Sequence, residues 1–210
     1  METLIHICGD GDTPGYRRTV DAFGNGTVTP CPACGRDKAI KAALDKACIP
    51  KRQAGAVLSA ARHGPQALAA LRLIEEPEAD YLVAGPTGVG KSWLAAAWVR
   101  HLCERGRPAV YLSLGAALIR DKAAAARGGQ RVDWGAAMAA PILALDEVLP
   151  ETPWERDLTD AIIVERHDEC RPTMVVTNAT LDTLRGCLSA PAYHRVASWR
   201  RIILDTEGSR

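Results

Sequence analysis

The octapeptide Gly-Pro-Thr-Gly-Val-Gly-Lys-Ser, residues 85–92, constrains the fold of this chain more than any other stretch. A short apolar run, Asp-Tyr-Leu-Val-Ala, precedes it, and a long helical pattern follows it. A glycine loop between a strand and a helix directs successive backbone N–H groups into one concavity, at the positive end of the helix. The spacing Gly, four residues, Gly-Lys-Ser in this context therefore predicts a phosphate-binding loop.

Each residue type in the loop has a physical role. The three glycines allow the tight turn, Lys91 would reach the β and γ phosphates, and the Ser92 hydroxyl would bind Mg²⁺. The predicted nucleotide-binding residues are Gly85, Pro86, Thr87, Gly88, Val89, Gly90, Lys91 and Ser92.

Short apolar strands alternate with helical patterns along the rest of the chain. The predicted strands are residues 80–85, 109–114, 141–148, 173–178 and 200–205, and helices are expected at 91–106, 115–129, 155–170 and 181–188. Strands that are apolar on both faces, alternating with helices, are typical of a parallel sheet covered on both sides. The sequence therefore predicts a doubly wound α/β domain that binds its ligand beyond the carboxyl ends of the strands.

Polar side chains end two of these strands. Asp146 and Glu147 follow the apolar run Ile-Leu-Ala-Leu, and Asn178 ends the next strand. Beside a triphosphate, Asp146 would hold Mg²⁺ through a water, and Glu147 would orient and deprotonate the attacking water. Asn178 could hold that water or contact the γ-phosphate, although a turn or helix cap is an equal interpretation. This arrangement favours a nucleoside triphosphate hydrolase over a small-molecule kinase.

Composition excludes several classes. The 210 residues are 47% hydrophobic and 24% charged, with a net charge of +1, so the whole molecule has no field that would attract nucleic acid. The start of the chain lacks a signal-peptide pattern and no stretch approaches a membrane span, so we expect a cytoplasmic protein without a membrane partner. Seven cysteines, an odd number, argue against a disulfide framework.

The first 36 residues are rich in Gly, Thr and Pro and too short to fold by burial alone. They contain Cys31 and Cys34 in a Cys-x-x-Cys pair, with His6 and Cys8 upstream, joined by a predicted hairpin over residues 17–30. Structural zinc takes four such ligands, which predicts a ribbon with a glycine-containing turn after each ligand pair. A site of three ligands completed by water and metal-free packing are the alternatives. The expected parts are residues 1–36, a helical linker over 37–80 and the ATPase core over 81–210.

The order of these motifs resembles an AAA+ ATPase, and the details are similar to the bacterial DnaC-type helicase loaders and the related IstB transposition helpers. Ala-Cys-Ile-Pro-Lys-Arg-Gln, residues 47–53, is similar to the family segment Gly-Ile-Pro, basic residue, aromatic. Residues 161–178 and 194–210 resemble the family's helix, turn and polar strand end and its closing arginine-containing segment. Loaders carry a comparable cysteine module, from which this chain departs because Ile5 stands in place of a cysteine. No helical lid follows the final strand, as in the DnaC type.

The resemblance implies roles for residues that spacing alone does not assign. Gly85 to Ser92 would be Walker A, Asp146 and Glu147 Walker B, and Asn178 sensor 1. Arg195 would be an arginine finger that completes the site of a neighbouring subunit in a ring or open helix, and Arg210 a terminal sensor arginine. For Arg195 the alternative is a surface arginine on a basic turn.

The function that the resemblance implies is ATP-dependent loading of a DnaB-type replicative helicase onto single-stranded DNA, with the N-terminal module contacting the helicase. Candidate DNA contacts are Arg120, Lys122, Arg127 and Arg131, although a solvated helix face explains them equally well. An IstB-like transposition helper is one alternative. A nucleotide-switched adaptor without significant hydrolysis is the other.

Overall fold

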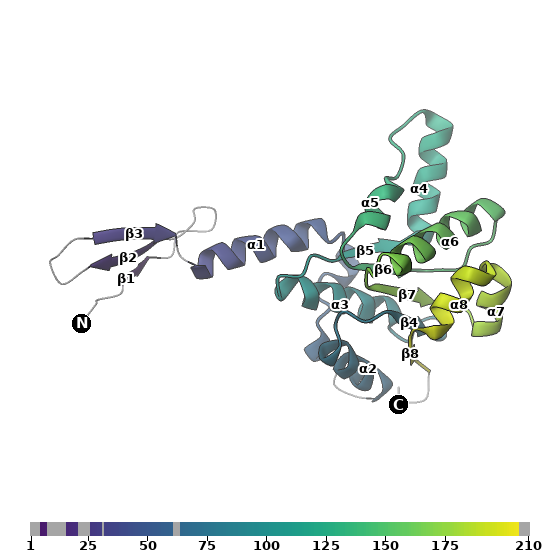
Figure 1. The fold of residues 1–210 in the computed structure, drawn as a ribbon, viewed down its shortest axis with the longest axis horizontal. Helices are drawn as coiled ribbons and strands as arrows, with labels where there is room; N and C mark the ends of the chain where they lie inside the picture. Colours follow the sequence, from purple (N-terminus) through teal and green to yellow (C-terminus); the bar gives the residue numbers. More distant parts are fainter. Residues whose placement is uncertain (1–4, 8–15, 21–25, 31, 61–63, 206–210) are drawn as a thin grey trace.

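The computed structural model describes the backbone of residues 5–7, 16–20, 26–30, 32–60 and 64–205, and the side chains of residues 35–59 and 67–205. Within these ranges the chain forms a three-stranded antiparallel sheet near the N-terminus and a five-stranded parallel sheet. Helix α1 (Pro32–Lys46) connects the two (Figure 1). No helix in the described part of the chain has the length and hydrophobicity to cross a bilayer.

The parallel sheet confirms the predicted α/β class. Its strands are β4 (Tyr81–Ala84), β5 (Val110–Ser113), β6 (Leu143–Asp146), β7 (Thr173–Thr177) and β8 (Arg200–Ile203), in the order β5-β6-β7-β4-β8. All four neighbouring pairs are parallel. The strand that precedes the glycine loop, β4, therefore lies between β7 and β8, and its carboxyl end opens into the crevice where such sheets bind ligands.

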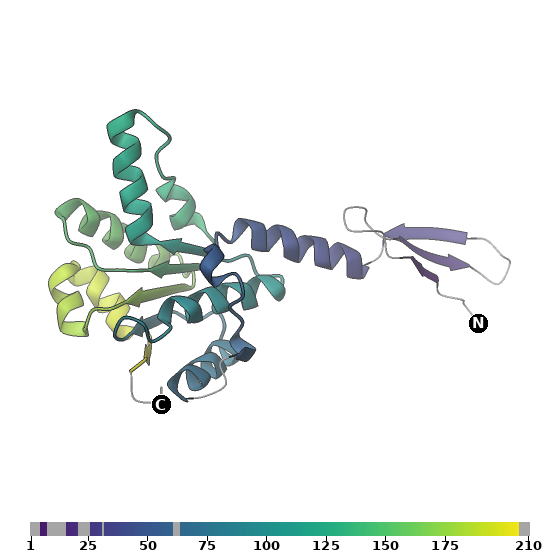
Figure 2. The same ribbon diagram turned by 180° about the vertical axis from the view of Figure 1, so that it is seen from behind.

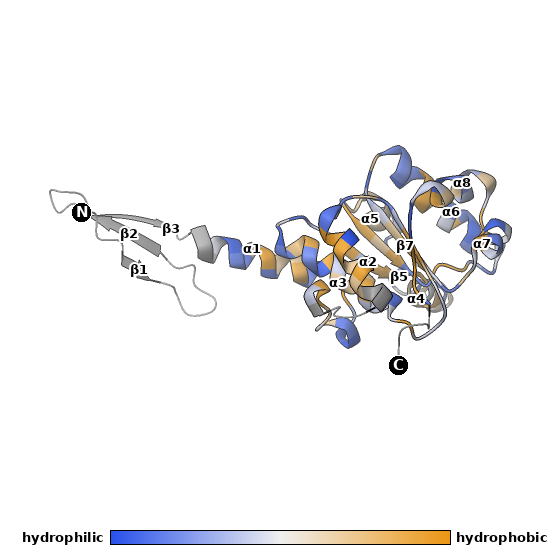
Figure 3. Cartoon of the chain, turned by 90° about the horizontal axis from the view of Figure 1, so that it is seen from below, coloured by the Kyte–Doolittle hydropathy of each residue, from blue (hydrophilic) through white to orange (hydrophobic). Residues whose placement is uncertain are grey.

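Helices cover both faces of this sheet because its strands bury side chains alternately on either side. Tyr81 and Val83 pack toward α2 (Gly64–Glu75) and α3 (Lys91–Glu104), whereas Leu82 packs toward the opposite layer. That layer contains α4 (Leu114–Arg127), α5 (Trp134–Ala139), α6 (Pro153–Asp168), α7 (Leu181–Cys187) and α8 (Ala190–Ser198). Figure 2 shows α2 and α3 in front of the sheet, and Figure 3 shows the apolar strands between the two layers.

Two helices, α5 and α8, have no counterpart among the predicted elements. Each begins at a short polar side chain that accepts a hydrogen bond from the first turn, Asp133 from the amide of Ala136 and Ser189 from the amide of Ala192. Proline in the first turn of α8 further favours that start. Both helices are short, which is why hydrophobic periodicity alone does not reveal them.

The N-terminal sheet contains β1 (Ile5–Ile7), β2 (Tyr16–Val20) and β3 (Gly26–Pro30). Antiparallel pairing of β2 with β3 confirms the predicted hairpin. Helix α1, in contrast, begins at Pro32, five positions before the expected helical start at Asp37, and runs through the predicted boundary at residue 36. Proline suits the first helical turn because it lacks the N–H that would be unpaired there. The turn predicted after Cys34 is therefore wrong: the backbone there is helical.

Arg166, on α6, holds the layer of α5 and α6 against the sheet. Its side chain is completely buried and donates to the backbone carbonyls of Ala137, Met138, Ala140 and Pro172, at 2.6–3.0 Å, and to the Thr173 hydroxyl at 2.9 Å. Burial lowers the pKa of Arg166 to about 10, which leaves the guanidinium charged at neutral pH. One side chain thereby satisfies the end of α5 and the turn before β7.

Candidate functional site

The glycine loop connects β4 to α3 as predicted, and its geometry suits an anion. Gly88 and Gly90 have φ of +88° and +90°, in the left-handed region that favours glycine. Gly90 is the N-cap of α3, and no side chain caps the helix. The first amides of the helix therefore remain available for phosphate oxygens, at the positive end of the helix dipole.

Gly85 has a different role, which is close packing against the end of the sheet. A Cβ built on Gly85 would lie 1.9 Å from the carbonyl oxygen of Leu204, whose amide bonds to the Ala84 carbonyl at 2.8 Å. Any side chain at this position would push the chain after β8 away from the loop.

We expect Gly85→Ala to lower the free energy of unfolding by about 3 kcal/mol, because the methyl group overlaps backbone that has little freedom to move. Gly88→Ala is the matched control: nothing lies within 4 Å of its Cβ position, so the expected loss is about 1 kcal/mol from the left-handed φ alone. Denaturation in urea measures both. Equal losses would contradict the packing role of Gly85.

Lys91 is 6% exposed and lies inside the loop, where its Nζ donates to the carbonyls of Gly85 and Pro86 at 2.7 and 2.6 Å. Burial lowers the pKa of Lys91, although the Asp146 carboxylate opposes that shift. A bound phosphate would supply the negative charge that two carbonyl dipoles only partly replace. The loop thus fits a polyphosphate in backbone shape, in charge and in its free helix terminus.

The two carboxylates lie at the end of β6 as predicted, and each is held by a residue of β5. Asp146 is 3% exposed, accepts a hydrogen bond from the Tyr111 hydroxyl and accepts another from the Glu147 amide at 2.9 Å. Burial and the adjoining Asp146 raise the pKa of Tyr111 far above its usual range, so this hydroxyl stays protonated and donates. With both oxygens engaged, Asp146 fits the predicted contact to Mg²⁺ through water.

Glu147 projects from the same turn with φ of +61°, a left-handed conformation that is uncommon outside glycine. Its Oε2 accepts a hydrogen bond from the Ser113 hydroxyl at 2.5 Å. The Ser113 oxygen also accepts from the Ala116 amide at 3.3 Å and so caps α4. The carboxylate predicted to act as base is therefore tied to the first turn of a neighbouring helix.

These groups converge on one pocket of about 450 Å³. Its walls are Arg52, Gln53, Thr87, Gly88, Gly90, Lys91, Ser92, Trp93, Asp146, Glu147, Thr177 and Asn178. The volume falls in the range of small-molecule sites. Gly85, Pro86 and Val89, the other predicted loop residues, are not among the walls; the first two hold Lys91 through their carbonyls. Ser92, Asp146 and Asn178 all lie where the sequence places them, at one edge of the sheet.

Several pocket residues were not expected from the sequence. Arg52 and Gln53 come from a short 3-10 helix, Lys51–Gln53, that follows α1. An indole on such a helix usually packs in the core. Trp93 is half-buried: it packs on the core and also lines the pocket. For Arg52 and Gln53, the only sequence signal is their position in the segment that resembles the family motif before the ATPase core.

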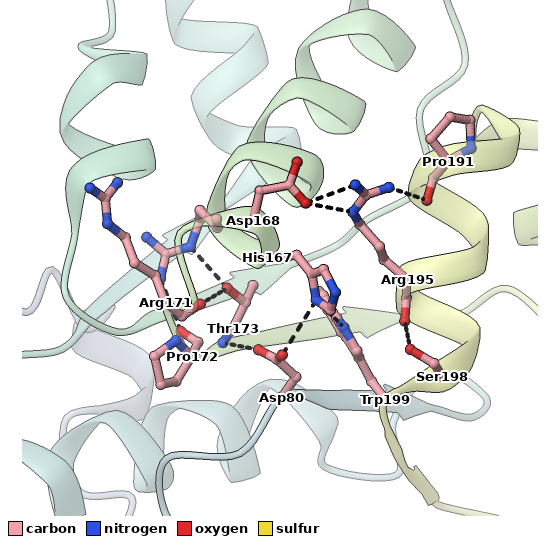
Figure 4. A network of polar contacts seen from close by, with 11 residues as sticks. Asp80, His167, Asp168, Arg171, Pro172, Thr173, Pro191, Arg195, Ser198 and Trp199 are labelled. Carbon is pink, nitrogen blue, oxygen red and sulfur yellow. Dashed lines mark hydrogen bonds and ion pairs between the residues drawn. The ribbon is translucent and has the colours of Figure 1, made fainter.

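Arg195 lies outside this pocket, near the amino ends of the strands. Its guanidinium donates to Asp168 at 2.7 and 3.2 Å and to the Pro191 carbonyl at 3.1 Å (Figure 4). Close to it, Asp80, which precedes β4, accepts from the amide of Thr173, the first residue of β7. The glycine loop follows the carboxyl end of β4, so Arg195 and the pocket lie at opposite edges of the sheet.

The four candidate DNA contacts differ in their surroundings. Lys122 forms an ion pair with Glu155 at 2.6 Å, and Arg131 binds the buried Asp121 through two nitrogens, at 2.7 and 2.5 Å. These pairs fix α4 to α6 and to the loop that precedes α5. Arg120 and Arg127 are exposed. Two of the four candidate DNA contacts, Lys122 and Arg131, are thus neutralised by ion pairs within the chain.

The remaining predicted site residues are not described at the level of side chains. Cys8, Cys31 and Arg210 lie outside the described residues, and for His6 and Cys34 the structure describes the backbone alone. Among the residues whose side chains are described, no group of three or more His, Cys, Asp or Glu is arranged to hold a metal ion. Zinc binding and the sensor role of Arg210 stay predictions.

Solved structures with the same fold include DnaC, DnaI and DnaA. The DnaC helicase loader superposes with a TM-score of 0.63 and 21% identity, over 74% of this chain and 99% of that chain. DnaI gives a TM-score of 0.62 and 22% identity, over 75% and 92%. AMPPCP-bound DnaA from Aquifex aeolicus gives 0.63 and 16%, over 75% of this chain and 51% of that chain. Because the sequence identities are this low, the superpositions show a shared fold alone.

No curated protein sequence matches the chain significantly. A family model described as IstB-like ATP binding protein, however, matches residues 57–192, more than half of the chain. The match includes the glycine loop, both carboxylates and Asn178. The chain therefore belongs to the family of IstB-like ATP-binding proteins, the IstB/DnaC branch of the AAA+ nucleotide-binding ATPases.

Proposed function

We propose that this protein hydrolyses ATP and uses the cycle to load a replicative helicase onto single-stranded DNA. The observation that carries the hydrolytic part is the convergence of Lys91, Ser92, Asp146, Glu147 and Asn178 on one pocket. A site that only bound nucleotide would need the phosphate loop but no group to activate water. The carboxylate of Glu147 beside it has no role in binding and suits a base for water.

The residues divide the work between binding and proton transfer. Lys91 and the first amides of α3 bind the phosphate oxygens and neutralise their charge. Ser92 and Asp146 would hold Mg²⁺, which supplies further neutralisation of the β and γ phosphates. Glu147 orients a water and takes its proton, and the exposed Asn178 amide lies at the same edge to hold that water.

Arg195 enters the proposal as a group that acts on a neighbouring subunit. It lies at the edge of the sheet opposite to its own pocket, so it cannot reach the phosphates that its own chain binds. A head-to-tail contact between two copies would place the edge of one against the pocket of the next, and repetition gives a ring or an open helix. The ion pair with Asp168 would have to open or shift for this contact.

A loader role is favoured by the fold shared with a DnaC helicase loader along nearly the whole of that chain. Single-stranded DNA and the helicase are the partners in this proposal, with Arg120 and Arg127 on α4 as the exposed basic candidates for DNA. Because the family model is named after IstB, a transposition helper is the second candidate. A nucleotide-switched adaptor is the third.

Copurification separates these functions. The tagged full chain, in the presence of ATP and Mg²⁺, is expected to retain the replicative helicase of its host, and the Lys91→Ala variant to retain less. Retention of a transposase in place of the helicase supports the transposition helper. A wild-type protein that binds ATP but shows no hydrolysis, with or without single-stranded DNA, would support the adaptor function.

Zinc analysis of the same preparation, with Cys31→Ser as control, tests the predicted metal site of the N-terminal module.

A further inference from the structure

A buried tyrosine hydrogen-bonds to both residues that would hold Mg²⁺. Tyr111, on β5, is 3% exposed and does not line the pocket. Its hydroxyl donates to Asp146 Oδ2, and the Ser92 side chain hydrogen-bonds to the same phenol oxygen. The phosphate-binding motifs assign no role to this residue, although it connects the glycine loop to the acidic end of β6.

The hydrogen-bonding capacity of the three side chains fixes the direction in which they donate. A carboxylate only accepts, so the single proton of the Tyr111 hydroxyl is directed at Asp146. The Tyr111 oxygen then takes part in a second hydrogen bond as an acceptor, and the Ser92 hydroxyl supplies the proton. Because the proton of Ser92 is used in this way, the lone pairs of its oxygen stay available to a metal ion in the pocket that Ser92 lines.

The surrounding structure holds the tyrosine and the carboxylate in place. Tyr111 belongs to the hydrophobic core between α3 and the sheet, and its amide bonds to the Ala47 carbonyl at 2.7 Å. In the parallel pair of β5 and β6 it lies opposite Ala144, two positions before Asp146. The second carboxylate oxygen, Oδ1, accepts from the Glu147 amide at 2.9 Å. Both oxygens of Asp146 are therefore oriented before any nucleotide binds.

We propose that Tyr111 is a positioning residue for the Mg²⁺ that accompanies the nucleotide: through one hydroxyl it joins Ser92 to Asp146 and holds both in the orientation that the metal requires. This inference rests on the proposed function, because the nucleotide brings the metal to the pocket. Groups that hydrogen-bond to metal ligands commonly contribute about 10–100-fold to metal affinity. Without the hydroxyl, Asp146 loses one of its two donors and the Ser92 proton is free to turn toward the metal.

Nucleotide binding with and without Mg²⁺ tests this role in the absence of hydrolysis. A fluorescent, non-hydrolysable ATP analogue is titrated into the protein once with excess Mg²⁺ and once with EDTA. The ratio of the two dissociation constants, the Mg²⁺ effect, measures the coupling between metal and protein. The wild type is expected to bind more tightly with Mg²⁺. In Tyr111→Phe the affinity with Mg²⁺ should fall about 10-fold, whereas the affinity in EDTA stays the same because Lys91 and the loop are unchanged.

Tyr81→Phe is the matched control. Tyr81 is buried in the same core, at 1% exposure, but its hydroxyl donates to the carbonyls of Arg72 and Glu76, at 3.2 and 2.8 Å, and not to a pocket residue. This variant loses a buried hydroxyl as Tyr111→Phe does, and it should keep the wild-type Mg²⁺ effect.

A Mg²⁺ titration of steady-state hydrolysis gives a second measurement. The Mg²⁺ concentration that gives half of the maximal rate should rise about 10-fold in Tyr111→Phe, while the rate at saturating Mg²⁺ stays within about threefold of the wild-type rate. A role in the fold alone would not confine the loss to low Mg²⁺.

Four results would overturn the assignment: a wild-type Mg²⁺ effect in Tyr111→Phe, an equal loss of affinity in EDTA, the same change in Tyr81→Phe, or a wild type whose affinity does not depend on Mg²⁺. An equal loss in EDTA, including complete loss of binding, would mean that the hydroxyl supports the fold of the pocket and not the metal. The proposed function fails separately, if the wild type does not bind the analogue under either condition.

Discussion

ATP hydrolysis by Glu147→Gln is expected to fall by about 10²–10⁴-fold, the usual contribution of a positioned general base. The amide keeps the shape of the carboxylate and can still accept from Ser113, but it cannot take a proton from water. ATP binding should remain close to that of the wild type, because Glu147 is exposed and the phosphate loop is unchanged. Steady-state phosphate release measures the first effect, and displacement of a fluorescent analogue measures the second.

Glu151→Gln is the matched control, since Glu151 is also exposed, lies four residues further along the same connection and does not line the pocket. Its hydrolysis rate should equal that of the wild type. A normal rate in Glu147→Gln, with binding intact, would show that another group acts as the base. Loss of binding in the same variant would mean that Glu147 supports the loop and not the chemistry.

Replacing Arg166 by methionine is expected to lower the free energy of unfolding by about 4 kcal/mol. The change takes a buried donor from four carbonyls and a hydroxyl, a cost that the removal of a buried charge only partly offsets. Two of these carbonyls keep a second donor, Met138 from Arg171 and Pro172 from the Leu143 amide. Arg171→Met provides the comparison. Arg171 also donates to the Met138 carbonyl, at 2.8 Å, but its side chain is 31% exposed and it pairs with Glu169 only at 3.8 Å.

For Arg171→Met the expected loss is below about 1 kcal/mol, because water can replace an exposed donor. Urea denaturation of the two variants, followed by circular dichroism, gives both values. The structural role of Arg166 would be refuted by similar losses in the two variants. Arg166→Lys should recover little, since one ammonium cannot reach carbonyls on both sides of the planar guanidinium.

The parallel sheet and the phosphate site could be predicted from the sequence because both depend on local signals. Apolar runs such as Leu143–Leu145 bury both faces of a strand, and the spacing from Gly85 to Ser92, between an apolar run and a helical pattern, predicts the phosphate loop. The positions of the polar residues at the strand ends could also be predicted from the sequence. Carboxyl ends of parallel strands share one edge, so Asp146 and Asn178 had to lie near the loop.

Other features depend on contacts between segments far apart in the chain, which no local pattern encodes. Gln53 enters the pocket because the segment after α1 is anchored to β5, where the Tyr111 amide bonds to the Ala47 carbonyl at 2.7 Å. Lys122 and Arg131 look like free positive charges in the sequence, and only the fold brings Glu155 and Asp121 to them. Charge counts on a helix therefore overestimate the surface available to a polyanion.

The serine at the end of β5 has a consequence for how hydrolysis and partner binding could be linked. Ser113 has a single hydroxyl proton, and it is given to Glu147 while the same oxygen accepts the Ala116 amide. A partner that displaced the first turn of α4 would weaken that contact and release the carboxylate from its fixed orientation. Control of the reaction by this helix would need no movement of the phosphate loop, only the loss or gain of one hydrogen bond.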